Sequence, residues 1–180
     1  KKLHVSDKLS KYFPDYPKGD SITIHQLLSH TSGIFNYTND AEFMNKEVTR
    51  PATREKMMAR FKDKPLDFSP GTKWNYSNSG YLLLGYIIED VTNMSWILAS
   101  ESTPAPVVDS SVSFAAGSIY STTGDLYKWF LALQANKLIR SSSKEKAFTP
   151  VLNKYGYGWG ADTIAGKRKI GHSGGIHGFV

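Results

Sequence analysis

One apolar stripe, which begins near Ser79, constrains the fold more than any other feature of the sequence. Its large aliphatic residues recur at helical spacing and are Leu83, Leu84, Ile87, Ile88 and Val91. A helix with so broad an apolar face must be covered by other parts of the chain. Asn93 suits the end of this helix, because asparagine tolerates the left-handed conformation found there. The sequence therefore predicts a well-buried helix from about Ser79 to Asn93.

Two further helices are predicted ahead of this stripe. Thr23 and Gln26 have the spacing of a capping box, in which the hydroxyl accepts the amide three residues on and the glutamine reaches back. We expect that helix to end at Thr31-Ser32-Gly33, with Gly33 in the left-handed position. A second helix is expected over Thr53–Phe61, and Ser69-Pro70-Gly71 has the composition of a type II turn.

The later part of the chain has a different pattern. Ser100–Ser113 is rich in Ser, Pro and Val and predicts a loop, whereas Thr123–Ala135 predicts a fourth helix. Tyr155–Trp159 alternates large and small residues as a packed strand does, and Arg168–His172 is a second candidate strand. Helices first and strands late favour an α+β fold or two lobes over an alternating βαβ arrangement.

Composition excludes several classes of protein. The chain has 180 residues, of which 40% are hydrophobic and 21% charged, so a buried core is feasible. No apolar run approaches the roughly 18 residues of a membrane helix, and the first residues do not resemble a signal peptide. The absence of cysteine excludes disulfides, thiolate metal sites and a cysteine nucleophile. The net charge of +6 is dispersed, and no aromatic or arginine-rich pattern accompanies it, so we expect no nucleic-acid partner.

Three short segments could carry chemistry. His30, in Leu27–Gly33, is more typical of a packed or capping histidine than of a catalyst. Tyr76-Ser77-Asn78 precedes the apolar helix. Either Ser77, Asn78 or Ser79 caps that helix, or Tyr76 and Asn78 project into a cleft. Such a tyrosine could move a proton only if a neighbouring cation lowered its pKa from about 10.

The third segment is Gly171-His172-Ser173-Gly174-Gly175, which matches the nucleophile elbow of α/β-hydrolases. The charged run Lys167–Lys169 is unlike the buried strand that precedes such an elbow. The chain also ends at Val180, without the acid and histidine that follow in that fold. A glycine-rich turn after a strand is the simpler interpretation. The histidines show no spacing that presents two ligands on one helical face, so no metal or other cofactor is predicted.

Taken together and in this order, the segments resemble the serine β-lactamase and penicillin-binding-protein-like hydrolases. That group includes class C β-lactamases, D-alanyl-D-alanine carboxypeptidases, D-aminopeptidases and esterases. The resemblance also rests on segments before and between these landmarks: Asp7–Pro14, Ile22–Ile24, Phe68–Gly71, Ala115–Thr122 and Tyr155–Trp159. It implies a helical lobe over 1–113 and, over 114–180, part of an antiparallel sheet flanked by helices.

The resemblance also implies roles for residues. Tyr76 would exchange a proton with the base that activates the nucleophile, and Asn78 would hold the amide or ester substrate. His172, Ser173 and Gly174 would bind the polar end of the substrate. The backbone N–H of Gly175 would form half of the oxyanion hole, which needs preorganised donors. Tyr76 and His172 are then expected to share one cleft.

One part of the pattern is missing from its place. The family's serine and lysine lie in an S-x-x-K motif ahead of these segments. Here that spacing occurs only later, in Ser141–Lys144 and Ser143–Lys146, and we interpret both as chance. We therefore expect an incomplete chain, shortened also near 99–108, that is inactive alone although the full protein is a serine hydrolase forming an acyl-enzyme.

Two alternatives stay open. The first is a non-catalytic homologue that binds a ligand in the cleft, and the second is an α/β-hydrolase with Ser173 as its nucleophile. The resemblance implies a small-molecule or peptide partner, with peptidoglycan-like material included, and an exported protein. His172 in place of a lysine favours a peptidase or esterase over a β-lactamase, by analogy alone.

Overall fold

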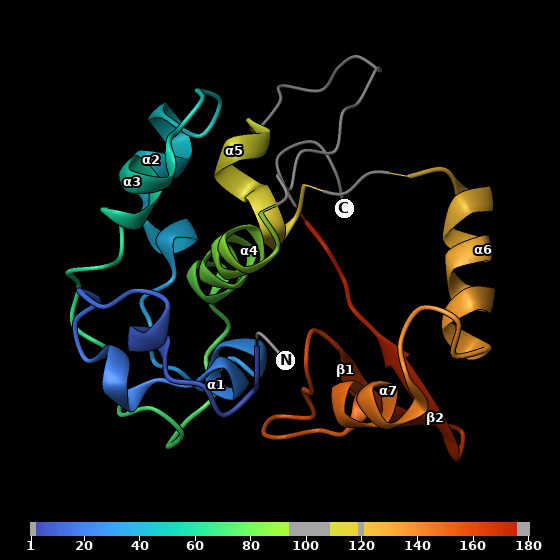
Figure 1. Ribbon diagram of the computed structural model, residues 1–180. Helices are drawn as coiled ribbons and strands as arrows, with labels where there is room; N and C mark the ends of the chain where they lie inside the picture. The colour runs from blue at the N-terminus through green and yellow to red at the C-terminus, as the bar shows by residue number, and fades with distance from the viewer. Residues whose placement is uncertain (1–2, 94–108, 119–120, 176–180) are drawn as a thin grey trace. The chain divides into compact units, whose positions relative to one another are not determined.

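The computed structural model describes residues 3–93, 109–118 and 121–175 (Figure 1). The contacts within the chain divide it into two compact units, which are described separately. Unit 1 comprises Lys1–Ser118 with Gly174–Val180, and unit 2 comprises Ile119–Ser173. The expected division into lobes 1–113 and 114–180 stays a prediction. No helix in the described ranges is long and apolar enough to cross a membrane.

Unit 1 is built from helices and short 3₁₀ turns. In chain order these are η1 (Leu9–Lys11), η2 (Gly19–Ser21), α1 (Ile24–Leu28), η3 (Tyr37–Asn39), α2 (Ala41–Lys46), α3 (Arg54–Met58), α4 (Asn78–Thr92), α5 (Ser110–Ser113) and η4 (Phe114–Ala116). The predicted helices after Thr23, within Thr53–Phe61 and from about Ser79 are confirmed. Asn93 ends α4 with a φ of 56° as predicted.

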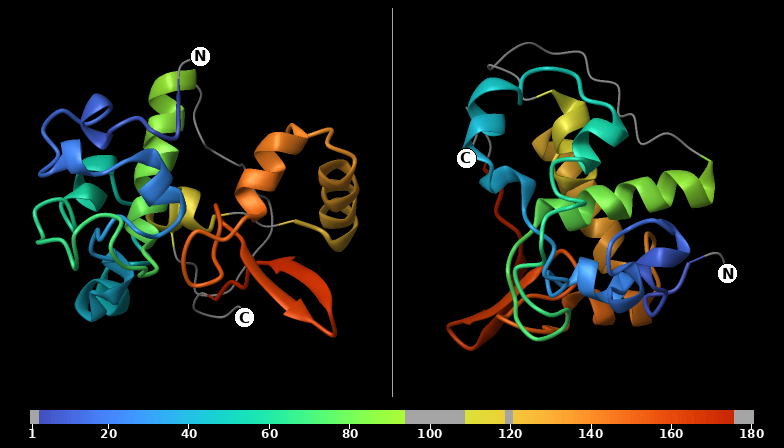
Figure 2. Two further views of the ribbon diagram at one scale, coloured as in Figure 1. Left: turned by 90° about the horizontal axis from the view of Figure 1, so that it is seen from below. Right: turned by 90° about the vertical axis from the view of Figure 1, so that its left-hand side faces the viewer.

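The long helix α4 organises the core of unit 1. It contacts α1, η3 and η4, and Figure 2 shows it beside the shorter blue and cyan segments of this unit. Leu82, Leu83 and Ile87 are fully buried. A Cβ at Gly85 would lie 2.4 Å from that of Ala115, so glycine lets η4 pack closely on α4.

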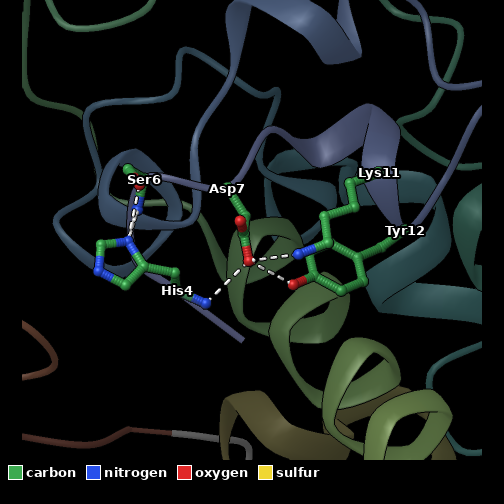
Figure 3. A network of polar contacts seen from close by, with 5 residues as sticks. All are labelled: His4, Ser6, Asp7, Lys11 and Tyr12. Atoms are coloured by element: carbon green, nitrogen blue, oxygen red, sulfur yellow. Dashed lines mark hydrogen bonds and ion pairs between the residues drawn. The ribbon is translucent and has the colours of Figure 1, made fainter. Parts of the chain in front are cut away.

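The N-terminal segment pairs with the residues that lead into α1. An antiparallel bridge joins Lys8 to Thr23, and the Thr23–Gln26 capping box forms as predicted. One carboxylate oxygen of Asp7 accepts hydrogen bonds from Tyr12 Oη at 2.6 Å and Lys11 Nζ at 3.0 Å (Figure 3). It also accepts the backbone N–H of His4 at 2.8 Å. These bonds fix the start of the chain to η1.

Unit 2 contains α6 (Thr123–Gln134), α7 (Ser141–Phe148) and an antiparallel hairpin of β1 (Gly160–Ile164) and β2 (Lys167–Gly171). The α+β fold class is thereby confirmed. Ala165 and Gly166 both have positive φ, which suits a two-residue hairpin turn that follows the twist of the strands. The register pairs Gly160 with Gly171 at the open end.

Two expectations about local structure were wrong. Tyr155–Trp159 is not a strand, because Gly158 has a φ of 75° and the Gly156 N–H donates to the carbonyl of Trp159, closing a turn. Within the predicted loop, Ser110–Ser113 forms α5, which Asp109 caps through the N–H of Ser111. The rest of that expected loop and the shortening near 99–108 fall largely on 94–108, outside the described residues.

Candidate active site

The predicted site residues lie in segments of both units. Tyr76 and Asn78 stand at the beginning of α4 in unit 1. His172 and Ser173 follow β2 in unit 2, and Gly174 and Gly175 come directly after them. Each segment has its own local geometry, and a shared cleft stays a prediction.

His30 fixes the Tyr76–Asn78 turn from a distant part of the chain. The backbone N–H of Ser77 donates to Nδ1 of His30 at 3.1 Å. The N–H of Asn75 donates to the carbonyl of His30 at 3.0 Å. The imidazole is 2% exposed, and its ring centroid lies 4.3 Å from that of Tyr76 and 5.0 Å from that of Tyr81. His30 is therefore a packed histidine, as expected, and it is bonded to the site segment.

The position of His30 follows from how α1 ends. The helix stops at Leu28, and His30 has a left-handed φ of 57°. The N–H of Thr31 donates to the carbonyl of Gln26, and the N–H of His30 donates to the carbonyl of Leu27. These two bonds form a Schellman motif at the end of α1. The expected role for Gly33 at this ending was therefore wrong.

Gly33 has a different structural role. Its own φ is 76°, and a Cβ there would lie 2.2 Å from the carbonyl oxygen of Phe68. Its carbonyl accepts the N–H of Asp67. The glycine therefore permits a close approach to Phe68 rather than ending α1.

The cap of α4 comes from Asn36 rather than from the three candidates of its own turn. Oδ1 of Asn36 accepts the N–H of Asn78 at 3.0 Å. Ser77 occupies the N-cap position without a capping bond, and its buried hydroxyl has no hydrogen-bond partner among the described residues. Ser79 instead accepts the N–H of Tyr37 and donates to the carbonyl of Phe35. The expectation that Ser77, Asn78 or Ser79 caps this helix was thus wrong, because Asn36 supplies the cap.

The carboxamide of Asn78 is oriented by η3. Its Nδ2 donates to Oγ1 of Thr38 at 3.2 Å, and the side chain is half-buried. This bond uses one of the two N–H groups of Nδ2, so the other N–H can donate to a substrate and Oδ1 can accept from one. Sequence reasoning missed Asn36 and Thr38, because a polar residue in a loop gives no signal that it bonds a turn about 40 positions later.

Burial raises the pKa of Tyr76 above its ordinary value. A buried phenol resists ionisation because its anion loses solvation. Tyr76 is therefore protonated near neutral pH in the described structure, and the lowered pKa that proton transfer requires is not present.

The segment after β2 is more open. His172 and Ser173 are exposed, and the His172 ring lies edge-on to Tyr155 with centroids 5.8 Å apart. Nδ1 of His172 lies 2.5 Å from the carbonyl oxygen of Ser173, so it donates there. Strand β2 ends at Gly171, so the His172-Ser173-Gly174 motif begins just beyond the strand rather than within it.

The two late serine–lysine spacings lie on α7. Nζ of Lys144 donates to the carbonyls of Leu133 and Gln134, both at 3.2 Å. Lys144 thus caps the C-terminal end of α6 and is directed away from a role as base for Ser141. Within the described ranges no cluster of three His, Asp or Glu side chains could hold a metal ion.

Comparison with known proteins identifies the family. The beta-lactamase family model matches residues 1–101. The chain belongs to the beta-lactamase family. The resemblance seen in the sequence is therefore confirmed.

Individual relatives agree with this membership. The chain is 29% identical to penicillin-binding protein 4* of Bacillus subtilis, over 98% of this chain and 51% of that protein. It is 30% identical to a putative penicillin-binding protein of the same organism, over 88% of this chain and 47% of that protein. The chain therefore spans about half the length of the curated relatives it matches.

A solved structure supports the same fold. A D-stereospecific amidohydrolase from Streptomyces sp. matches with a TM-score of 0.86 and 27% identity. The match covers 98% of this chain and 69% of that one. The α+β fold of this chain is therefore part of a β-lactamase-type fold.

Proposed function

We propose that the complete protein cleaves amide or ester bonds through an acyl-enzyme on a serine. The observation that carries this proposal is the Tyr76–Asn78 turn, which His30, Asn36 and Thr38 hold in place in a chain of the beta-lactamase family. Holding reactive groups in a fixed geometry before the substrate arrives is a large part of catalysis.

The proposed reaction has two steps. A serine hydroxyl outside the described residues attacks the carbonyl carbon while its proton passes to a base, and the resulting oxyanion collapses with loss of the amine or alcohol. Water then attacks the acyl-enzyme and releases the acid. Tyr76 takes part in the proton transfer once a cation next to it favours its anion, since burial alone raises its pKa.

The remaining residues bind the substrate. Asn78 accepts a substrate N–H through Oδ1, and the bond from its Nδ2 to Thr38 holds the carboxamide in place. His172, Ser173 and Gly174 bind the polar end of the substrate, and Gly175 donates its N–H to the oxyanion. The names of the relatives, penicillin-binding proteins and a D-stereospecific amidohydrolase, support a small peptide or amide substrate of peptidoglycan type. They also support an exported protein.

An acylating probe tests this function. A fluorescent penicillin or fluorophosphonate should label the complete protein once per molecule and leave the 180-residue chain unlabelled. Tyr76→Phe in the complete protein should lower the labelling rate by about 100-fold or more, with a much smaller change in binding. Stoichiometric labelling of the 180-residue chain would refute the assignment of the nucleophile to another segment.

One observation favours a second function, a ligand-binding homologue without turnover. Burial raises the pKa of Tyr76 in the described structure, which disfavours the anion that proton transfer requires. That alternative predicts saturable ligand binding without covalent labelling of the complete protein. Labelling that Ser173→Ala abolishes would instead indicate the α/β-hydrolase mechanism, which membership in the beta-lactamase family disfavours.

A further inference from the structure

We infer that His30 is a positioning residue whose neutral imidazole, accepting through Nδ1, sets the placement of Tyr76 and Asn78. The geometry stands on its own, and the catalytic consequence rests on the proposed function. His30 touches neither a substrate nor a reacting atom in this assignment. It acts through the backbone that carries the two site residues.

The hydrogen bond from Ser77 fixes the protonation of the ring. A backbone N–H can only donate, so Nδ1 of His30, 3.1 Å from the Ser77 nitrogen, must present a lone pair. The ring is then neutral and carries its proton on Nε2. In an imidazolium, Nδ1 would also carry a proton, which would face the N–H of Ser77. Two donors cannot share a hydrogen bond, so this contact would be lost.

His30 also contacts both sides of the turn. Its carbonyl accepts from Asn75 and its ring accepts from Ser77, so the backbone on either side of Tyr76 is bonded to one residue. Ser77 is in turn the residue between Tyr76 and Asn78. A shift of this backbone would therefore move the phenol and the carboxamide together.

The backbone conformation of His30 is one that glycine would adopt more easily. A left-handed φ of 57° is unusual for a residue other than glycine and is strained. Glycine would satisfy the Schellman ending of α1 with less strain but could not reach Ser77. The ring is also 2% exposed and tilted against Tyr76 and Tyr81, which keeps Nδ1 aimed at the turn.

Two variants of the complete protein separate positioning from simple folding. His30→Asn places Oδ1 near the position of Nδ1 and tolerates the left-handed backbone. His30→Leu fills a similar volume and cannot accept a hydrogen bond. We expect His30→Leu to lower kcat per active site on the order of 100-fold, because small displacements of catalytic groups have effects of that size. Its KM should change only a few-fold, and His30→Asn should recover most of the rate.

Active sites are counted with the acylating probe, so that unfolded molecules do not lower the measured kcat. A purely structural role predicts fewer labelled molecules in His30→Leu with an unchanged kcat for each. That outcome overturns the positioning role, as does a His30→Asn variant that is as slow as His30→Leu.

A spectroscopic measurement keeps this inference separate from the proposed function. With histidine and serine labelled with ¹⁵N, a scalar coupling across the hydrogen bond should join the Ser77 amide nitrogen to Nδ1 of His30. Absence of the coupling, or a proton on Nδ1, overturns the inference whether or not the protein is an enzyme. If the coupling is present and the unaltered protein resists acylation, the proposed function fails while His30 is still shown to hold the turn.

Discussion

The two units hold their parts of the proposed site in different ways. In unit 1, residues about 40 positions or more away bond the Tyr76–Asn78 turn, and α4 behind it is packed on several sides. In unit 2, His172 and Ser173 are exposed, and Nδ1 of His172 donates to the carbonyl of the adjacent Ser173. Long-range hydrogen bonds thus fix the first segment, whereas the second is exposed and contacts Tyr155 through the His172 ring.

Burial differs in the same direction. Over its described residues, unit 1 has eighteen buried hydrophobic residues in one cluster, among them Leu9, Ile22, Leu27, Met57 and Leu83 at 0% exposure. Over the described part of unit 2 the buried hydrophobic residues are Leu133, Tyr155 and Ala161. On α6, Trp129, Phe130 and Leu131 are each about half exposed. Because burial of apolar area is the main stabilising term, unit 1 should be the more stable unit.

The largest effect is expected from truncating the core of unit 1. Leu83→Ala removes a fully buried side chain of α4 and should lower the free energy of unfolding by about 2–5 kcal/mol. Leu131→Ala in α6, where the side chain is 47% exposed, is the matched control and should cost less than about 1 kcal/mol. Urea unfolding measures both, and equal losses would contradict the difference between the units.

The caps of α4 and α6 give a second, smaller contrast. Asn36→Ala removes the acceptor for Asn78 N–H at a partly buried helix start and should cost about 1–2 kcal/mol. Thr122→Ala removes the cap of α6, where an exposed hydroxyl accepts the N–H of Asp125, and should cost about 0.5–1 kcal/mol. Thermal unfolding of the two variants would refute the contrast if the order were reversed.

Local signals predicted more of the fold than of the site. The capping box at Thr23, the left-handed ending at Asn93 and the turn at Gly71, which has a φ of 85°, all depend on residues within a few positions. The cap of α4 could not be predicted, because Asn36 is 42 residues from Asn78. Ser77 has a high propensity for the N-cap position, but in the folded chain Asn36 accepts the N–H at the start of α4.

Alternating residues were misleading in unit 2 for a related reason. Tyr155–Trp159 has the period of a strand, but a Cβ at Gly156 would lie 2.2 Å from the carbonyl oxygen of Ala147. Gly156 permits this close approach and Gly158, with a φ of 75°, forms a turn, so neither belongs to a pleated strand. A packed strand and a glycine-containing turn can show the same alternation of large and small residues. The sequence alone therefore cannot distinguish a strand from a turn here.

A third prediction concerns the orientation of Asn78. Thr38→Val keeps the shape of the side chain and removes the oxygen that accepts Nδ2 at 3.2 Å. Loss of one neutral hydrogen bond is worth about 0.5–1.5 kcal/mol, which corresponds to a few-fold to roughly tenfold weaker substrate binding. The KM of the complete protein for an amide substrate should rise accordingly, while an ester lacking that N–H should be affected less. Equal effects on both substrates would argue that Asn78 does not accept the amide.

The smallest effect concerns the acidic group at the start of unit 1. Hydrogen bonds from Tyr12 and Lys11 lower the pKa of Asp7 from 3.8 to about 2. Because the folded-state pKa is the lower one, the stability that Asp7 contributes is complete above about pH 4 and is lost as the pH falls toward 2. Asp7→Asn should therefore flatten the decline of stability over that interval.

Asp162 in unit 2 supplies the control for this last prediction. Its pKa is also lowered, chiefly by Lys154, but the pair is exposed on both sides, at 72% and 56% for the two side chains. Solvent screens such a pair, so Asp162→Asn should change the acid profile less than Asp7→Asn. Acid titrations followed by circular dichroism compare the two variants. A larger change for Asp162→Asn would mean that the tethering of the N-terminal segment, unlike the packing of α4, contributes little to the greater stability expected of unit 1.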